Sequence, residues 1–310
     1  MTQHPDVDVV IATRDRPQLL RDSIRSIVAS DYAGAIRVLV VYDRSEPDNE
    51  LHLDASLGLR PGRTLEVLHN NRTPGLAGAR NSGVLAAEAE LVAFCDDDDT
   101  WLPAKLTRQI AALNAAPTAE MVCCGVEVEY AGTFHRRLLD QREVTLTDLL
   151  RDRLTELHPS TFVMRRKAVI DGFGLVEEEI PGSYAEDYEF LLRAARSHPV
   201  LNVPMVGVRV LWSQGSYFTG RWTTIREALT WLLDRYPEFA SVPEGEARIL
   251  GQIAFATASE GSRRQGAELA WRALRTRPAE PRTYLALGVA SGILKPDWVI
   301  RQLHRTGRGL

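Results

Sequence analysis

Apolar runs alternate with amphipathic stretches along residues 7–115 of the chain. Four apolar runs have the length and β-branched content of buried strands: Val7–Ala12, Ile36–Tyr42, Leu65–Leu68 and Leu91–Cys95. Apolar residues recur at helical spacing after Pro17 and Pro103, and a glycine-rich turn at Gly75–Gly78 precedes a helix predicted over Asn81–Glu90. Strands that alternate with helices predict a Rossmann-like α/β fold with a mostly parallel central sheet.

The pattern changes twice in the second half of the chain. Between Met121 and about Val210, strand-like runs are mixed with one strong amphipathic helix, AEDYEFLLRAARS. From Arg221 onward the sequence is mostly helical, and Ala, Leu and Arg dominate it. We therefore predict one domain over residues 1–215, followed by a helical C-terminal region over residues 216–310.

Composition excludes some classes of protein. The 310 residues are 45% hydrophobic and carry a formal net charge of −4, which argues against a nucleic-acid partner. The 3 cysteines, Cys95, Cys123 and Cys124, have neither the number nor the spacing of a disulfide framework or a zinc site. The segment MTQHPDVDVV lacks the basic region and the apolar stretch that are typical of a signal peptide, and no run of about 18 apolar residues predicts a spanning helix. These features predict a cytoplasmic protein and leave a peripheral membrane contact and homo-oligomerisation open.

Three polar clusters follow the predicted strands: Thr13–Arg16, Asp43–Ser45 and Asp96–Asp99. In open α/β sheets, ligands bind beyond the carboxyl ends of the strands. The shared position of the three clusters predicts that they form one site.

The run Asp96–Asp99 is the strongest chemical signal. Four adjacent carboxylates repel one another unless a cation or solvent compensates them. Because side chains alternate along a strand, Asp96 and Asp98 are predicted to project the same way and to offer hard oxygen ligands to Mg²⁺ or Mn²⁺. The alternative is a solvated acidic turn that precedes the helix at Pro103.

The segment FCDDDDTWLPAKL resembles the D-x-D segment of family 2 glycosyltransferases, which have the GT-A fold. Four other segments resemble that family in its own order: VVIATRDRPQLLRDSIRSI, VLVVYDRS, NRTPGLAGARNSGV and GSYAEDYEFLLRAA. The resemblance spans residues 7 to about 212. It implies a metal-dependent, inverting transfer of a sugar from a nucleotide-diphosphate sugar, with UDP or dTDP favoured, to a hydroxyl acceptor.

The resemblance also implies roles for matching residues. Six would contact the nucleotide sugar: Thr13, Arg16, Asp43, Arg72, Arg80 and Asp96. Asp98 would be the principal metal ligand, with Asp96 beside it, for Mn²⁺ or Mg²⁺. Asp187 would be the general base, with Glu186 next to it. A carboxylate within reach of a hydroxyl can take its proton during attack, although an acidic pair is also typical of a plain helix start.

The sequence departs from the family pattern at three places. Tyr42 and Arg44 stand where the family usually has aspartate and glycine, which leaves the nucleotide open. Ser213 and Gln214 follow Trp212 where many relatives have a histidine that binds the metal. His158 is a candidate for the acceptor pocket or the metal, and equally for a structural role.

Two other functions remain open at this point. A nucleotidyltransferase shares the sheet and the acidic ligands, but the segment after the first strand lacks the glycine-rich loop of that class. A non-catalytic sugar-nucleotide-binding protein is the other alternative. No G-x-G-x-x-G follows the first strand, which argues against a dinucleotide dehydrogenase. The acceptor is left open among a glycan, a lipid-linked acceptor and a small molecule.

Overall fold

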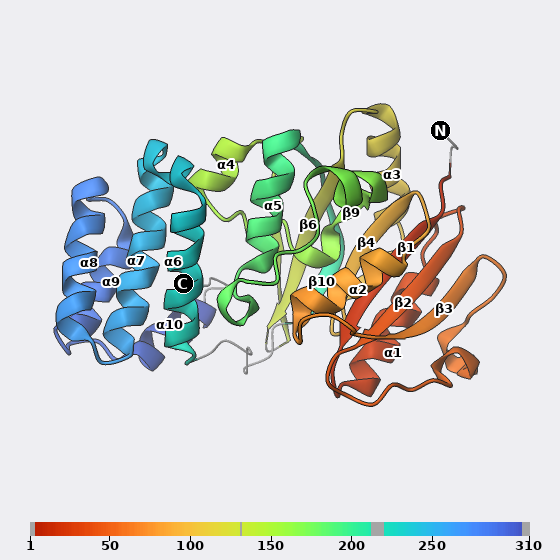
Figure 1. Cartoon of the computed structure of the whole chain (residues 1–310), viewed down its shortest axis with the longest axis horizontal. Coiled ribbons are helices and arrows are strands. Elements are labelled where there is room, and N and C mark those ends of the chain that lie inside the picture. The colour runs from red at the N-terminus through yellow and green to blue at the C-terminus, as the bar shows by residue number, and fades with distance from the viewer. Residues whose placement is uncertain (1–3, 131, 212–219, 306–310) are drawn as a thin grey trace. The chain divides into compact units, whose positions relative to one another are not determined.

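The computed structural model describes residues 4–130, 132–211 and 220–305 (Figure 1). The chain forms two compact units. The α/β unit is built from Met1–Thr145, Leu154–Glu178 and Glu186–Trp212, and the helical unit from Leu146–Arg153, Glu179–Ala185 and Ser213–Leu310. The predicted boundary between residues 215 and 216 lies outside the described residues and stays a prediction.

The α/β unit is organised around one sheet. Its strands are β1 (Val7–Thr13), β2 (Ile36–Tyr42), β3 (Arg63–His69), β4 (Leu91–Asp96), β5 (Thr100–Trp101), β6 (Met121–Tyr130), β7 (Thr133–Arg137), β8 (Glu143–Val144), β9 (Val163–Arg165) and β10 (Val200–Leu211). The main order is β3-β2-β1-β4-β9-β6-β10-β5. The first four strands pair in parallel, as do β6 and β10, whereas β9 pairs antiparallel with β4 and β6. The predicted α/β class is confirmed.

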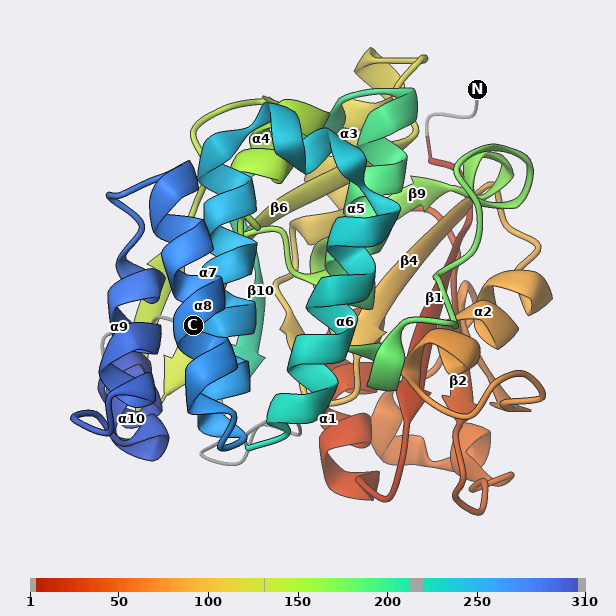
Figure 2. The ribbon, with the colours of Figure 1, turned by 60° about the vertical axis from the view of Figure 1, so that its left-hand side comes forward.

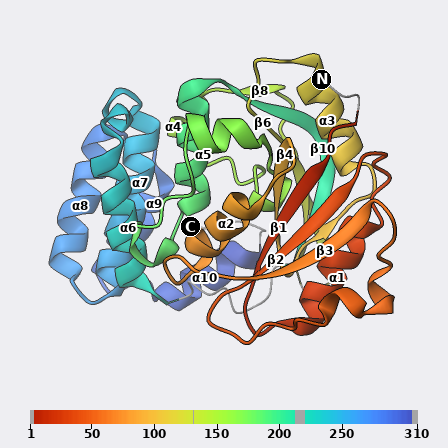
Figure 3. The ribbon, with the colours of Figure 1, turned by 45° about the vertical axis from the view of Figure 1, so that its right-hand side comes forward.

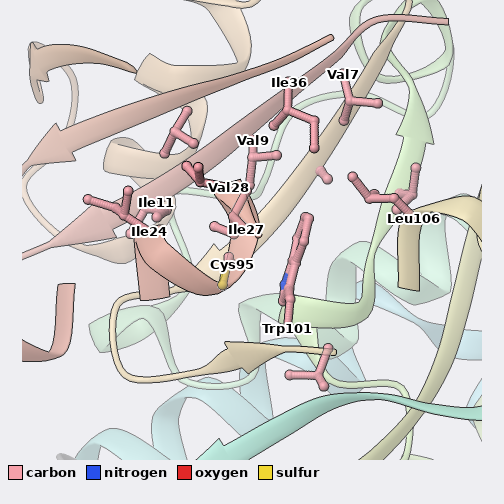
Figure 4. Close-up of a cluster of buried hydrophobic side chains, with 14 of the residues drawn as sticks. Val7, Val9, Ile11, Ile24, Ile27, Val28, Ile36, Cys95, Trp101 and Leu106 are labelled. Carbon is pink, nitrogen blue, oxygen red and sulfur yellow. The ribbon is translucent and has the colours of Figure 1, made fainter. Parts of the chain in front are cut away.

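Helices cover both faces of this sheet. They are α1 (Pro17–Val28), α2 (Leu76–Ala86), α3 (Lys105–Ala115) and α5 (Glu186–Ser197). Val9 and Ile11 of β1 contribute to a buried cluster with Ile24 and Ile27 of α1 (Figure 4). The alternate residue Val10 faces α2 on the other side, where a Cβ on Gly83 would meet its side chain at 2.3 Å. Figure 3 shows α2 and α5 on this second side of the strands.

The helix α2 begins earlier than the sequence predicts. The predicted turn Gly75–Gly78 and helix Asn81–Glu90 are wrong in their bounds, because the helix runs from Leu76 to Ala86. Only Gly75 needs the conformational freedom of glycine, with φ of 129°. Gly78 instead allows close packing, since a Cβ there would lie 1.9 Å from the Thr73 carbonyl oxygen.

Lys105, at the start of α3, is fully buried. Its amine lies 3.7 Å from the centre of the Trp101 ring, a favourable position for a cation. Among the described residues, the amine has no hydrogen-bond acceptor. Burial lowers the pKa of Lys105 to about 8, because an ammonium loses its hydration in the core.

The helical unit contains α4 (Leu146–Arg151), α6 (Trp222–Arg235), α7 (Pro243–Ser259), α8 (Arg263–Thr276), α9 (Pro281–Ala290) and α10 (Pro296–Arg305). Three of these helices begin with proline, whose fixed φ suits the first helical turn and whose missing N–H costs nothing there. Helix α7 packs against α6, α8 and α9 (Figure 2). Its middle is buried on every side from Ala247 to Ala258. No helix in the described ranges is long and apolar enough to cross a bilayer.

Candidate active site

The strand register brings the three polar clusters to one edge of the sheet. Thr13 pairs with Tyr42, and Ala12 with Asp96. The backbone N–H of Asp43 donates to the Thr13 carbonyl at 3.0 Å. The strands therefore end level, as the sequence predicts, and the clusters that follow them adjoin one another.

The four aspartates divide into two pairs by burial. Strand β4 ends at Asp96 and the chain then turns, so the alternation predicted from an extended strand does not continue through the run. Asp97 and Asp99 are buried. The side chains of Asp96 and Asp98 are 24% and 29% exposed. Asp96 and Asp98 are thus the two more exposed carboxylates of the run.

Thr13 and Arg16 hold the middle of the aspartate run. The Thr13 hydroxyl donates to Asp97 at 2.8 Å. The Arg16 guanidinium donates to Asp97 at 3.2 Å and to Asp98 at 2.7 Å. Burial and the neighbouring carboxylates Asp96 and Asp97 raise the pKa of Asp98 to about 6. Arg16 therefore supplies part of the positive charge that the crowded carboxylates need.

Asp96 and Asp99 lie around His158. The His158 Nδ1 is 3.3 Å from an Asp99 oxygen, and its Nε2 is 4.0 Å from an Asp96 oxygen. The Ser160 hydroxyl donates to Asp99 and accepts from the Asp96 backbone N–H, which fixes both residues to the turn after His158. One ligand atom from each of Asp96, Asp99 and His158 falls within 4.8 Å of the others. Oxygen and imidazole nitrogen ligands at this spacing are compatible with a divalent cation.

Arg80 connects the aspartate run to the start of α5. Its guanidinium donates to Asp96 at 2.7 Å and to Glu186 at 2.8 Å, and the side chain is only 3% exposed. Burial, with the adjacent Asp187 carboxylate, raises the pKa of Glu186, and the charge of Arg80 opposes that rise. The resemblance implies that Arg80 faces the diphosphate or the ribose end of the donor. In the structure both of its partners are carboxylates of the site, and its contact with a donor stays a prediction.

A pocket of about 510 Å³ opens at the ends of β2 and β3. Its lining includes Tyr42, Asp43, Arg44, His69, Asn70 and Arg72. One Asp43 oxygen accepts from the Asn70 amide at 2.8 Å and from the Gly75 N–H at 3.1 Å, while the other accepts from Arg44 at 3.1 Å. Burial acts to raise the pKa of Asp43, but these hydrogen bonds outweigh it, and the pKa lies below its ordinary value.

The sequence model described as "Glycosyl transferase family 2" matches residues 8–173, more than half of the chain. The chain belongs to this family. The match contains the three strand-end clusters, Arg80 and His158. The prediction that this chain is a glycosyltransferase is confirmed.

Relatives of this family 2 glycosyltransferase occur among bacteria. The glycosyltransferase YwdF of Bacillus subtilis is 25% identical over 207 residues, which are 65% of this chain and 72% of YwdF. Other relatives match over 21–40% of their own length. Three of these, from Campylobacter jejuni and Escherichia coli, are named as β-1,3-glucosyltransferases for diphosphoundecaprenol-linked acceptors.

Two solved structures are similar to this family 2 glycosyltransferase. S. aureus TarS 1-349 in complex with UDP-GlcNAc has a TM-score of 0.60 at 15% identity, covering 98% of this chain and 92% of that one. The mannosyltransferase PcManGT from Pyrobaculum calidifontis, in complex with GDP-Man and Mn²⁺, has a TM-score of 0.60 at 18% identity, covering 94% and 82%. These likenesses show the GT-A type of fold, as predicted.

Three further residues of this family 2 glycosyltransferase contact the site residues, and they were not predicted from the sequence. Asn70 follows β3 as Asp43 follows β2, so its position at a strand end was a usable signal. Ser160 lies in the segment HPSTF and had no signal beyond its neighbour His158. Glu178 accepts from Arg72, from the Thr73 N–H and from Asn81, and no local pattern indicates this long-range contact. Trp212, Ser213 and Gln214 lie outside the described residues.

Proposed function

We propose that this chain is a metal-dependent, inverting glycosyltransferase with Asp187 as its general base and a UDP- or dTDP-linked sugar as its donor. The observation that carries the proposal is the buried bridge Asp96–Arg80–Glu186, in which both contacts are 2.8 Å or shorter. It supports a common site for the aspartate run and the acidic start of α5, because one rigid guanidinium binds both.

The donor set around Asp96 fits a divalent cation. Asp96 and Asp98 are the ligands implied by the family, and Asp99 and His158 offer further oxygen and nitrogen atoms next to Asp96. Mg²⁺ and Mn²⁺ prefer the carboxylate oxygens of such a set and usually retain water and phosphate oxygens in their other positions. When bound there, the cation would neutralise negative charge on the diphosphate leaving group. Arg16 offers further positive charge at the same edge.

The start of α5 supports Asp187 as the base. Glu186 is buried, and its carboxylate accepts a hydrogen bond from Arg80, which is a structural role. Asp187, the next residue, is only partly buried and lies close enough to influence the pKa of Glu186 and of Arg80. Asp187 lies in the first turn of α5, where the helix dipole favours its ionised form. The ionised carboxylate is the form that takes a proton from an acceptor hydroxyl. A single displacement with one base inverts the anomeric carbon.

The pocket around Asp43 supports a uracil or thymine base. One Asp43 oxygen accepts from Asn70 and Gly75, and the other accepts from Arg44. A remaining lone pair of this second oxygen can accept a single ring N–H. Uracil and thymine present one such N–H between two carbonyl groups. Guanine presents a ring N–H beside an amino group, and cytosine and adenine present a ring nitrogen that only accepts. The Arg44 guanidinium, whose Nε donates to this second oxygen, has further N–H groups that can donate to a base carbonyl.

Nucleotide binding tests this function directly. Calorimetry should show that UDP or dTDP binds more tightly than GDP and CDP, and that Mn²⁺ strengthens the binding. The variant Asp96→Asn should lose the effect of Mn²⁺, whereas Asp140→Asn, an exposed aspartate outside the site, should keep it. Absence of metal-dependent binding for every nucleoside diphosphate would refute the proposal.

A further inference from the structure

The last three helices concentrate positive charge in an otherwise acidic chain. Residues 263–305 contain nine Arg and Lys and three Asp and Glu, a net charge of +6, whereas the other residues sum to −10. Charge separation of this kind marks a surface that meets an anionic partner.

The same helices expose large apolar side chains. Trp271 of α8 is 58% exposed, Tyr284 of α9 is 55% exposed, and Ile293, after α9, is 82% exposed. Trp298 of α10 is 47% exposed. Exposing large apolar side chains to water is unfavourable, so several of them on neighbouring helices indicate a contact surface.

A groove between α8 and α9 is lined by both basic and apolar residues. It has a volume of about 530 Å³, and its lining includes Arg263, Arg264, Ala267, Leu287, Gly288 and Ile293. The start of α8 therefore lies beside the end of α9, which makes the two helices antiparallel neighbours. Trp271 is seven residues after Arg264 and four after Ala267, and Tyr284 is three residues before Leu287. Helical periodicity places each on the face of its helix that lines the groove.

We infer that this surface, formed by the α8–α9 groove with Trp271 and Tyr284, docks on a bilayer that contains anionic phospholipids. Trp and Tyr are favoured at the membrane interface because each has an apolar body and a polar edge. Arginine binds phosphate oxygens in a bidentate manner. Arg264 is 94% exposed, and its ion pair with Glu268 at 3.1 Å is also exposed, so lipid phosphate can replace Glu268. Arg263 and Arg264 line the groove, and the net charge of +6 over the three helices favours an extended anionic surface over a single acidic peptide.

Vesicle binding of the full chain tests this inference without any need for turnover, so its outcome is independent of the proposed function. The chain should sediment with vesicles of phosphatidylcholine and phosphatidylglycerol and stay in solution with phosphatidylcholine alone. Arg263→Ser with Arg264→Ser should weaken binding about thirtyfold, because each basic residue near an anionic surface contributes roughly fivefold. Trp271→Ser should weaken it about tenfold.

Matched variants on the α/β unit serve as controls. Arg60→Ser with Arg108→Ser removes the same charge from exposed positions, and Leu53→Ser removes an apolar side chain that is 68% exposed. Both should bind anionic vesicles like the unmodified chain, and melting curves verify that all variants fold. Equal binding to both vesicle types, no binding to either, or equal losses in test and control variants would overturn the inference. So would tight binding of a poly-glutamate peptide in the groove by a chain that ignores vesicles.

Discussion

Arg80 and Arg16 of the α/β unit contrast with Arg264 of the helical unit. In the α/β unit, Arg80 is 3% exposed and is bound by two carboxylates, and Arg16 bridges two more. In the helical unit, Arg264 is 94% exposed and stands beside an apolar groove. A buried guanidinium fixes the geometry of its partners, whereas an exposed one is available to a new anion. The comparison separates a unit arranged for chemistry from one arranged for contact.

The largest expected effect concerns the acidic start of α5. Asp187→Asn removes the proposed base but keeps the size of the side chain, so transfer should fall by about 10³-fold while UDP binding is retained. Initial rates and calorimetry on the same preparation measure the two quantities. Asp171→Asn, at an exposed position of the same unit, is the control. Normal turnover by Asp187→Asn would place the base elsewhere.

Arg80 is expected to give the next largest effect. Arg80→Met leaves Asp96 and Glu186 in the interior without their shared counter-charge, which should lower the free energy of unfolding by about 3–5 kcal/mol. Urea unfolding measures it. Arg264 is exposed, so Arg264→Met should change the free energy of unfolding by less than about 0.5 kcal/mol. Equal effects of the two substitutions would break the contrast between the units.

Lys105 provides a test with a definite pH dependence. Its pKa falls from the ordinary 10.5 to about 8, so below pH 8 the folded chain bears the full cost of a buried ammonium. Between pH 8 and 10.5 the folded chain releases the proton before the unfolded chain does, and that cost declines. Lys105→Met should therefore stabilise the protein by about 3 kcal/mol at pH 7, with a gain that disappears toward pH 10. A gain independent of pH would contradict this account.

Arg44 is expected to give the smallest effect. It has a positive φ of 51°, which glycine adopts without strain, so Arg44→Gly should be neutral or stabilise by up to about 1 kcal/mol. The same change removes the donor beside Asp43 and should weaken UDP binding about fivefold. Calorimetry of UDP and CDP distinguishes loss of base recognition from loss of general affinity.

Much of the fold was predictable because its signals are local. The runs that became β1, β2 and β4 are short, apolar and β-branched, and each ends in a polar cluster. The start of α2 was mispredicted because Gly75 has a positive φ, whereas Gly78 and Gly83 allow close packing inside the helix, against Thr73 and Val10. The network of Ser160, Asn70 and Glu178 depends on contacts between distant segments. Sequence spacing carries no information about such contacts.

Lys105 also has a consequence for chemical labelling. The chain contains three lysines, and the other two, Lys167 and Lys295, are exposed. Amine-reactive reagents should therefore modify those two quickly and reach Lys105 only when the region around Trp101 opens. Lys105 is the protected lysine of the α/β unit, and Lys167 and Lys295 are exposed references, one in each unit. Mass spectrometry of a labelling time course therefore reports local opening of the α/β unit without any engineered probe.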